Sequence, residues 1–292
     1  MSNIKFSILS MTLLLIAGAC STNKNLTSVN DQRITRTAFF PKSRTLKNPL
    51  PDPDKTFVFL MAGQSNMAGR GQVMPMDTVE DPRILTLNIN GEVEIAKEPL
   101  HFYEPELQGL DCGLSFAKSV INQLPKGSYI LLVPMAVGGS STKDWLGDDV
   151  YRGVRLMTNF TNRVEKARQL GTIKALLWHQ GESDANEASI LLYEDKIKSL
   201  FTSLRSKSGK PDLPIVMGEL GDFGHKDDAT WKLLNALMHQ LETTDKNLKV
   251  VSSAGLHHKG DNLHFDSEGQ RSMGKRYADA YLAHFYSKTN GQ

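Results

Sequence analysis

The chain has 292 residues, of which 40% are hydrophobic and 23% are charged, an ordinary globular mixture that excludes collagen-like, low-complexity and wholly disordered proteins. Its 34 Lys and Arg residues nearly balance its 32 Asp and Glu residues. Nucleic acid is not expected as a partner, because neither sign forms a long run that would neutralise a phosphate backbone.

The N-terminus, residues 1–19, is predicted to be a secretory signal peptide. Lys5 is followed by an apolar stretch from Phe6 to Ala19 that is shorter than the roughly 18 to 20 residues of a membrane span. The stretch ends in Ala17-Gly18-Ala19-Cys20, which resembles the bacterial lipobox. We therefore expect an exported protein of a bacterial cell envelope, attached to the membrane only through a lipid on Cys20. The alternative is ordinary signal cleavage, with Cys20 paired to Cys112 in an oxidising compartment.

Residues 20–55 are rich in Ser, Thr, Asn, Lys and Pro and have almost no apolar periodicity. This composition predicts a flexible, poorly ordered tether. The folded domain is then expected to span residues 56–292.

Within that domain, short apolar runs alternate with helical periodicity. The runs predict strands at Thr56–Ala62, Ser128–Val133, Ile173–His179, Pro214–Leu220 and Leu248–Ser253. Helices are predicted at Leu114–Leu124, Val154–Leu170, Ala188–Leu204, Ala229–Leu241 and Glu268–Phe285. Asn90-Gly91 within Ile84–Ala96 predicts a β-hairpin. Together these patterns predict a parallel sheet covered by helices on both faces.

Four blocks of residues with possible chemical roles follow predicted strands or precede the last helix. They are Gly63–Arg70, Val137–Ser141, Trp178–Asp184 and Asp261–Phe265. Ligands of open parallel sheets bind beyond the carboxyl ends of the strands, so these blocks are expected to meet there. An ordinary α/β-hydrolase is disfavoured, because Met67 stands at the final glycine position of its Gly-x-Ser-x-Gly motif. In the last block, a carboxylate three residues before a histidine can fix the imidazole tautomer.

The order and spacing of these blocks resemble those of the SGNH/GDSL hydrolases, in their carbohydrate esterase branch of sialate O-acetylesterases and acetylxylan esterases. The matching motifs are Gly-Gln-Ser-Asn-Met-Ala-Gly-Arg, Val-Gly-Gly-Ser-Ser, His-Gln-Gly-Glu-Ser-Asp and Asp-Asn-Leu-His. The resemblance extends from about Thr56 to the C-terminus. It implies an α/β fold, a flavodoxin-like three-layer α/β/α sandwich with a mostly parallel sheet. It also implies a serine esterase without metal or cofactor, whose substrate is an acetylated carbohydrate.

The same resemblance implies a role for each matching residue. Ser65 is expected to be the nucleophile, His264 the general base and Asp261 the acid that orients the base. The oxyanion donors implied are the backbone N–H groups of Ser65 and Gly139 and the side-chain amide of Gln180. Asn66, Gly138 and Glu182 are expected to support the site. We expect Asp261 to raise the pKa of His264 above its usual value of about 6.5.

Each of these residues also has a structural explanation. Ser65 is also suited to cap a helix, and Gly138-Gly139 to form a plain turn. Gln180 and Glu182 could instead stabilise the conformation of a loop. For Glu182 we favour this structural role over a contribution to the electrostatic field at His264.

Other residues near the blocks leave further alternatives open. His257 and His258, with Asp261 and His264, superficially resemble a metal cluster, but their spacing matches no recognised zinc pattern. His179 is expected to line the site or to lie behind it, and Trp145 to stack on a sugar or to pack in the protein. Bulky Met67, Trp145 and Trp178 predict a short acyl cavity. The alternative functions are a lipase or thioesterase and a non-catalytic glycan-binding lipoprotein.

Overall fold

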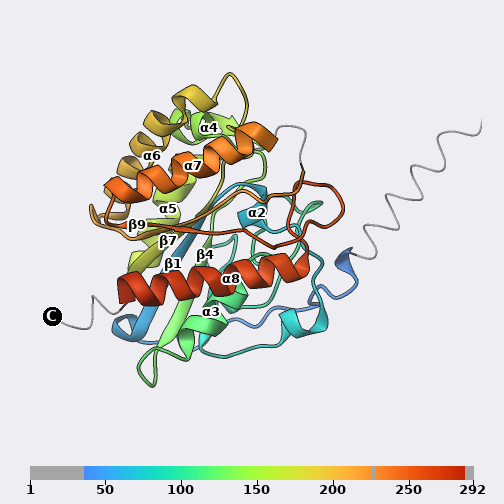
Figure 1. Cartoon of the computed structure of the whole chain (residues 1–292). Helices are drawn as coiled ribbons and strands as arrows, with labels where there is room; N and C mark the ends of the chain where they lie inside the picture. The colour runs from blue at the N-terminus through green and yellow to red at the C-terminus, as the bar shows by residue number, and fades with distance from the viewer. Residues whose placement is uncertain (1–35, 225–227, 287–292) are drawn as a thin grey trace, which may run out of the picture. The chain divides into compact units, whose positions relative to one another are not determined.

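The computed structural model describes residues 36–224 and 228–286, and its main element is a seven-stranded sheet in the order β3-β2-β4-β1-β7-β8-β9 (Figure 1). The strands of this sheet are β1 (Thr56–Gly63), β2 (Ile84–Leu87), β3 (Val93–Ile95), β4 (Tyr129–Pro134), β7 (Thr172–His179), β8 (Ile215–Gly218) and β9 (Leu248–Val251). Neighbouring strands are parallel except for the predicted hairpin of β2 and β3. The strands are almost wholly buried, as their continuous apolar sequences predict.

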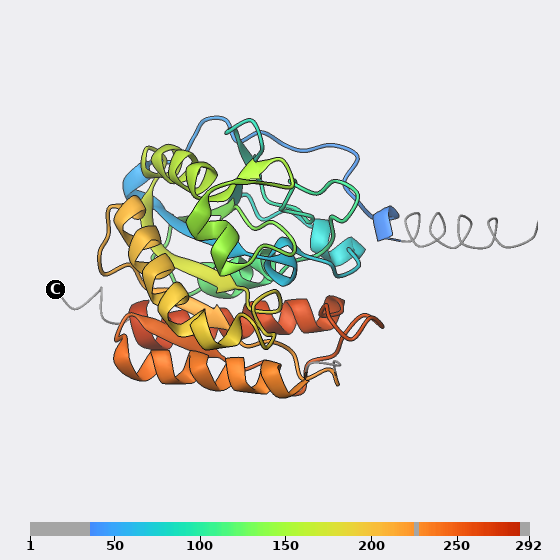
Figure 2. The same cartoon turned by 90° about the horizontal axis from the view of Figure 1, so that it is seen from above.

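Helices cover both faces of the sheet (Figures 1 and 2). On one face, α3 (Gly113–Ile121) packs against α8 (Ser267–Tyr281). On the other face lie α5 (Leu156–Arg168), α6 (Tyr193–Ser208) and α7 (Asp228–Thr244). The predicted three-layer α/β/α fold is therefore confirmed.

The strand order places the site. Counted along the chain, β4-β1-β7-β8-β9 has the 2-1-3-4-5 order of flavodoxin-like sheets. The chain moves from β1 to β4 in one direction and then to β7 in the other, so the connections diverge between β1 and β7. A crevice for ligands is expected at this point, beyond the carboxyl ends of these two strands.

The largest differences from the predicted boundaries occur in short elements. Val154, predicted to begin a helix, instead lies in β6 (Val154–Arg155), which pairs with β5 (Val150–Tyr151) in a small hairpin. A 3₁₀ turn precedes α6, which therefore begins five residues later than predicted, at Tyr193. Helices α2 (Ser65–Ala68) and α4 (Thr142–Gly147) were not predicted, because segments this short show no helical period.

The prediction of a flexible tether is wrong for residues 36–55, which pack on the domain. The backbone N–H of Lys47 donates to the carbonyl of Val93 at 2.8 Å, and the backbone N–H of Ile95 donates to the carbonyl of Thr45 at 2.8 Å. Arg44 donates to the carbonyls of Lys97 at 2.5 Å and Pro99 at 2.6 Å. The backbone bonds of Thr45 and Lys47 pair an edge strand, β3, with a polar segment that has no apolar periodicity of its own.

Residues 1–35 lie outside the described part of the chain, and with them the predicted signal peptide and Cys20. Among the helices that the structure describes, none is both long enough and apolar enough to cross a bilayer.

Candidate active site

The close pairing of β1 with β7 brings the first and third blocks together. Gly63, at the end of β1, has φ +135°, and a Cβ there would lie 2.1 Å from the carbonyl oxygen of His179. The next backbone N–H, that of Gln64, donates to the same oxygen at 2.9 Å. Only glycine allows this approach, and the chain turns directly into α2, whose first residue is Ser65.

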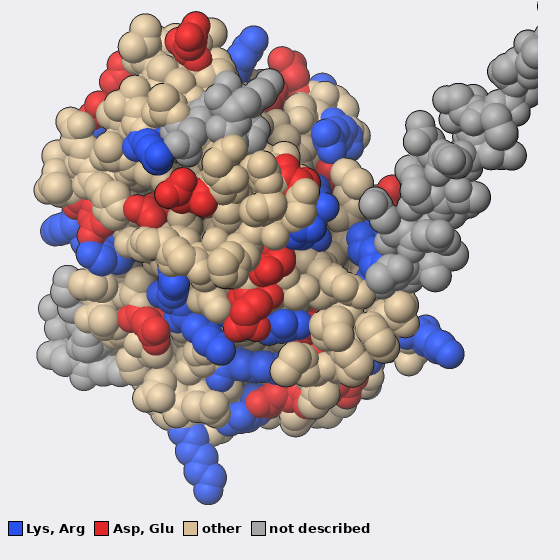
Figure 3. Space-filling view, turned by 45° about the vertical axis from the view of Figure 1, so that its right-hand side comes forward, with Lys and Arg blue, Asp and Glu red and all other residues tan. Residues whose placement is uncertain are grey.

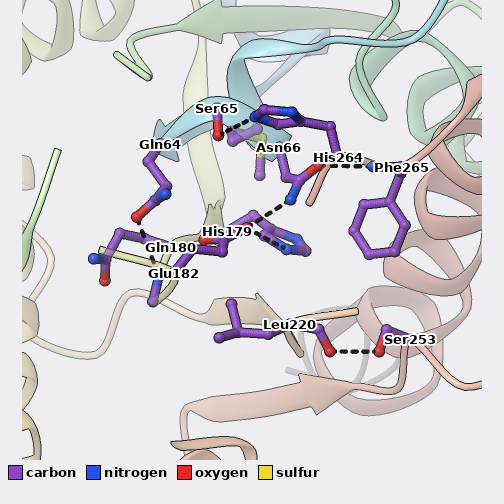
Figure 4. A network of polar contacts seen from close by, with 12 residues as sticks. Gln64, Ser65, Asn66, His179, Gln180, Glu182, Leu220, Ser253, His264 and Phe265 are labelled. Atoms are coloured by element: carbon purple, nitrogen blue, oxygen red, sulfur yellow. Dashed lines mark hydrogen bonds and ion pairs between the residues drawn. The ribbon is translucent and has the colours of Figure 1, made fainter. Parts of the chain in front are cut away.

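Ser65, His264 and Asp261 form a continuous line of hydrogen bonds, of which Figure 4 shows the one between Ser65 and His264. Ser65 Oγ lies 3.0 Å from His264 Nε2, and His264 Nδ1 lies 2.7 Å from Asp261 Oδ2. A carboxylate accepts, so Nδ1 carries the proton and Nε2 is the acceptor for the serine hydroxyl. Ser65 comes from α2 and the other two residues from the loop before α8, where His264 lies 199 residues from Ser65 along the chain.

The loop conformation holds Asp261 in its ionised form. Its Oδ1 accepts the backbone N–H groups of Leu263 at 3.1 Å and His264 at 2.9 Å, and Lys259 Nζ lies 3.0 Å from Oδ2. Burial acts to raise the pKa of Asp261, but the hydrogen bonds from His264 and Lys259 outweigh burial and hold it well below its ordinary value. The carboxylate therefore stays charged beside the imidazole.

The expected rise in the pKa of His264 is wrong. Burial lowers this pKa below 6.5 and outweighs Asp261, which acts to raise it, while the positive charges of Arg70 and Lys259 lower it further. The imidazole is therefore neutral at pH 7 and able to accept a proton.

This pKa predicts the acid limb of the pH profile. If neutral His264 is the base, kcat/KM for an acetyl ester should fall as the pH is lowered through a midpoint below 6.5, because protonation removes the acceptor on Nε2. The measurement is kcat/KM between pH 4 and pH 8 at constant ionic strength. Activity undiminished at pH 4, or a midpoint above 6.5, would count against this assignment.

The second block forms a tight loop beside Ser65. A Cβ on Gly138 would lie 2.3 Å from a guanidinium nitrogen of Arg70, and a Cβ on Gly139, where φ is +79°, would lie 2.8 Å from the hydroxyl of Tyr151. The Gly138 N–H donates to Glu104 Oε2 at 2.6 Å, and the Gly139 carbonyl accepts the Ser183 hydroxyl at 2.9 Å. The positive φ of Gly139 favours glycine whatever its role toward substrate, and a side chain on Gly138 would push aside the ends of Arg70 and Glu104.

Gln180 is fully buried at the end of β7. Its Nε2 donates to Asp184 Oδ2 at 2.5 Å and to the carbonyl of Ser140 at 3.4 Å. The amide thus joins the second and third blocks, as the loop-organising interpretation requires. To donate to an oxyanion, the Gln180 amide would have to give up its longer bond, the one to Ser140. Its role as an oxyanion donor therefore stays a prediction.

Asn66 and Glu182 lie behind the serine and the histidine. Asn66 Nδ2 donates to Glu182 Oε1 at 2.6 Å, and only 4% of the Glu182 side chain is exposed. Burial raises the pKa of Glu182 to about 7. His179 is buried beside it, hydrogen-bonded through Nδ1 to Tyr277 at 3.1 Å, and burial lowers its pKa to about 3. His179 is therefore neutral and lies behind the site.

Sequence reasoning missed an ion-pair group beside Gly138 and Gly139. Glu104 joins Arg70, at 2.6 Å, and Arg152, whose side chain is 47% exposed. Arg152 has φ +46° and sits with Gly153 at the turn of the β5–β6 hairpin. Arg70 stands in the first block, where no role was assigned to it. Gly153 beside Arg152 is a turn signal that could have identified the hairpin, whereas Glu104 lies in a loop with no pattern to identify it.

Three bulky side chains near the blocks belong to the core. Met67, Trp145 and Trp178 are fully buried, so stacking of Trp145 on a sugar is wrong. Trp145 Nε1 donates to Ser140 Oγ at 3.0 Å, and its ring packs edge-on against Trp178. Cys112 is also buried, with its sulfur 3.8 Å from that of Met67.

The four residues that resembled a metal cluster make other contacts. His258 Nδ1 accepts the backbone N–H groups of Gly260 at 3.1 Å and Asn262 at 3.0 Å, while His264 and Asp261 bond each other. Within residues 36–224 and 228–286, no three His, Cys, Asp or Glu side chains are placed to hold a metal ion.

The face that carries the loops has mixed charge. Figure 3 brings forward the right-hand side of the view in Figure 1, and basic and acidic side chains are interspersed over it. The ion-pair group beside the glycine loop contains two cations and one anion.

Comparisons with known proteins identify the family and agree with the fold. The family model described as carbohydrate esterase, sialic acid-specific acetylesterase, matches residues 55–283. A probable carbohydrate esterase of Arabidopsis thaliana is 34% identical over 259 residues, which is 82% of this chain and 94% of the relative. An X-ray structure of an Arabidopsis thaliana protein shares 33% identity and a TM-score of 0.69, over 80% of this chain and 100% of that one. A carbohydrate acetylesterase of Xanthomonas citri shares the fold, with 19% identity and a TM-score of 0.62 over 79% of this chain and 57% of that one. The chain therefore belongs to the carbohydrate esterase family of sialic acid-specific acetylesterases.

Proposed function

We propose that this carbohydrate esterase removes O-linked acetyl groups through a Ser65-His264-Asp261 triad and an acyl-enzyme intermediate. The observation that carries the proposal is the unbroken line from Ser65 Oγ through the imidazole to the Asp261 carboxylate, with bonds of 3.0 and 2.7 Å. A serine hydroxyl is a weak nucleophile at neutral pH and needs such a base within hydrogen-bond distance.

In the first half-reaction, Ser65 Oγ attacks the acetyl carbonyl carbon while its proton passes to His264 Nε2. The negative charge that develops on the carbonyl oxygen is stabilised by the backbone N–H groups of Ser65 and Gly139 and by the Gln180 amide. The bond to the sugar oxygen then breaks, and that oxygen takes the proton from Nε2. The products are a deacetylated sugar and acetyl-Ser65.

In the second half-reaction, His264 Nε2 accepts a proton from water as the water oxygen attacks acetyl-Ser65. The ester bond to Oγ breaks, Oγ recovers the proton from Nε2, and acetic acid leaves. Asp261 stays ionised in both halves and stabilises the imidazolium that forms twice.

The acyl group distinguishes this proposal from a lipase or thioesterase. We expect kcat/KM to fall from acetyl to butyryl to octanoyl esters of one alcohol. Arg152 beside the glycine loop is half-exposed and presents a charged group, so a longer chain lying against it would not gain the roughly 0.8 kcal/mol per methylene of an apolar pocket. The test is to measure initial rates for each ester at concentrations at which it is soluble. A rate that rises toward the octanoyl ester would favour the lipase or thioesterase alternative without contradicting the proposed triad.

The natural substrate is proposed to be an acetylated xylan-type polysaccharide or an acetylated sialic acid. The half-exposed guanidinium of Arg152 near Gly139 favours the sialic acid, whose carboxylate it would attract. Acetate release from a panel containing both, with the Ser65→Ala variant as the blank, is the decisive experiment. A glycan-binding protein without activity would release acetate from neither.

We also propose that the protein is exported and held at the bacterial cell envelope by a lipid on Cys20. The sequence Ala17-Gly18-Ala19-Cys20 supports this, since a thioether-linked lipid needs that sulfur. Cys20→Ala should abolish incorporation of a fatty-acid label and move the protein out of the membrane fraction, whereas Cys112→Ala should keep the label. A wild-type protein without label, and with Cys20 bonded to Cys112, would refute the anchor.

A further inference from the structure

The side chain of Asn66 connects the nucleophile to the loop that carries the base (Figure 4). Asn66 directly follows Ser65 and is 2% exposed. Its Nδ2 donates to the carbonyl of Leu263 at 3.2 Å, and its Oδ1 accepts the backbone N–H of Phe265 at 3.1 Å. Because these two residues flank His264, one amide holds the chain on both sides of the imidazole.

Glu182 reinforces the orientation of this amide that the Leu263 carbonyl and the Phe265 N–H also require. Its Oε1 accepts the second proton of Asn66 Nδ2 at 2.6 Å. If the amide were turned over, its oxygen would face two acceptors, Glu182 Oε1 and the Leu263 carbonyl, and its nitrogen would face the Phe265 N–H. The observed orientation is therefore the only one in which every contact pairs a donor with an acceptor.

Both side chains of this contact are almost wholly buried, since Asn66 is 2% exposed and the Glu182 side chain 4%, and breaking the bond would leave buried polar atoms without that partner. Glu182 comes from the block after β7, and its side chain packs with that of His179, whose Nε2 lies 4.0 Å from Oε1. Figure 4 shows Asn66 between Glu182 and His264. Glu182 thus reaches the base through Asn66, while the charges that act on His264 directly are those of Asp261, Arg70 and Lys259.

We propose that Glu182 is a positioning residue of the esterase: by holding the Asn66 amide, it sets the peptide groups on both sides of His264 and keeps the imidazole facing Ser65. This inference rests on the proposed function, because it assigns Glu182 a role in that reaction. It predicts an effect on turnover rather than on substrate affinity, since Glu182 is buried behind the reacting groups.

The test is a double-mutant cycle on kcat and KM for p-nitrophenyl acetate. We expect Glu182→Ala to lower kcat by roughly 10- to 100-fold with KM nearly unchanged, the scale on which a displacement of about 1 Å slows catalysis. Asn66→Ala should cost at least as much. The double variant should be no slower than Asn66→Ala, because Glu182 has no route to His264 once the amide is gone. Glu182→Gln, which keeps an acceptor but also carries donors, should recover part of the loss.

Glu219→Ala is the matched control. Glu219 follows β8, and its carboxylate accepts the Ser253 N–H at 2.9 Å and contacts His239 at 2.6 Å. Loss of this carboxylate should leave kcat for p-nitrophenyl acetate within about threefold of wild type, since its bonds go to groups that do not hold His264.

Several outcomes would overturn the inference. They are an unchanged kcat in Glu182→Ala, additive losses in the double variant, or an equal loss in Glu219→Ala. Circular dichroism and thermal melting establish that each variant is folded, and if Glu182→Ala does not fold, an unchanged kcat in both Glu182→Gln and Asn66→Ala has the same meaning. Full activity of Ser65→Ala would instead refute the proposed function, so the two failures are distinguishable.

Discussion

Replacing Ser65 with alanine is expected to lower kcat/KM for an acetyl ester by a factor on the order of 10⁴ to 10⁶, while the protein stays folded. This is the scale on which a serine hydrolase loses turnover without its nucleophile, the small remainder coming from the oxyanion donors and substrate binding. The removed oxygen bonds His264 Nε2 at 3.0 Å, and a single hydroxyl contributes little to the apolar core, so the fold should be kept. Initial rates with p-nitrophenyl acetate and with an acetylated sugar give the factor.

A serine away from the site controls for the substitution itself. Ser203 Oγ donates to the carbonyl of Ser199 within α6, and the residue is half-buried and away from the site, so Ser203→Ala should keep wild-type activity. A phosphonate ester that traps serine nucleophiles should label wild-type protein at Ser65 and leave Ser65→Ala unlabelled. Wild-type turnover in a folded Ser65→Ala protein, or label on another residue, would refute the assignment of the nucleophile.

Replacing Asp261 with asparagine is expected to lower kcat by roughly 10³- to 10⁴-fold. The asparagine amide can present N–H to the imidazole, which favours the tautomer with its proton on Nε2. That nitrogen then cannot accept the serine proton. The substitution also removes the negative charge that stabilises the imidazolium. Water will screen part of that effect, because the Asp261 side chain is 33% exposed.

The matched control removes the other partner of the same oxygen. Lys259 Nζ lies 3.0 Å from Asp261 Oδ2, and 40% of the Lys259 side chain is exposed. Lys259→Ala should change kcat by less than about threefold, because surface ion pairs contribute little. The acid limb of the pH profile of the Lys259→Ala variant should move to slightly higher pH, since the charge of Lys259 lowers the pKa of His264. If Asp261→Asn were no slower than Lys259→Ala, Asp261 would not be the orienting acid.

Several features were readable from local sequence because local physics controls them. The apolar run from Thr56 suits a strand buried on both faces, and Asn90-Gly91 suits a tight hairpin turn, and both are present. The blocks were expected to meet because the carboxyl ends of parallel strands share one edge of a sheet. The structure brings Ser65 within hydrogen-bond distance of His264, as that argument predicts.

Other features depend on residues far apart in the sequence. The polar segment around Lys47 carries no strand pattern, yet it bonds to β3 because the edge of the sheet has backbone groups that need partners. Trp145 follows a block of site residues, but its ring turns into the core against Trp178. Neither outcome has a local signal, because the partner lies on another element.

The sequence by itself determined the fold class, the chemical types at the strand ends and the spacing that lets Asp261 bond His264. Only the tertiary structure decided the sign of the His264 pKa shift, the bonding of the Gln180 amide to Asp184 and the hydrogen bond between Asn66 and Glu182. The physical reason is that a carboxylate three residues away is a local property, whereas burial is the sum of every segment packed around the imidazole. At His264 the lowering of the pKa by burial outweighs the raising of the pKa by the Asp261 carboxylate, and no single stretch of sequence shows how deeply the imidazole is buried.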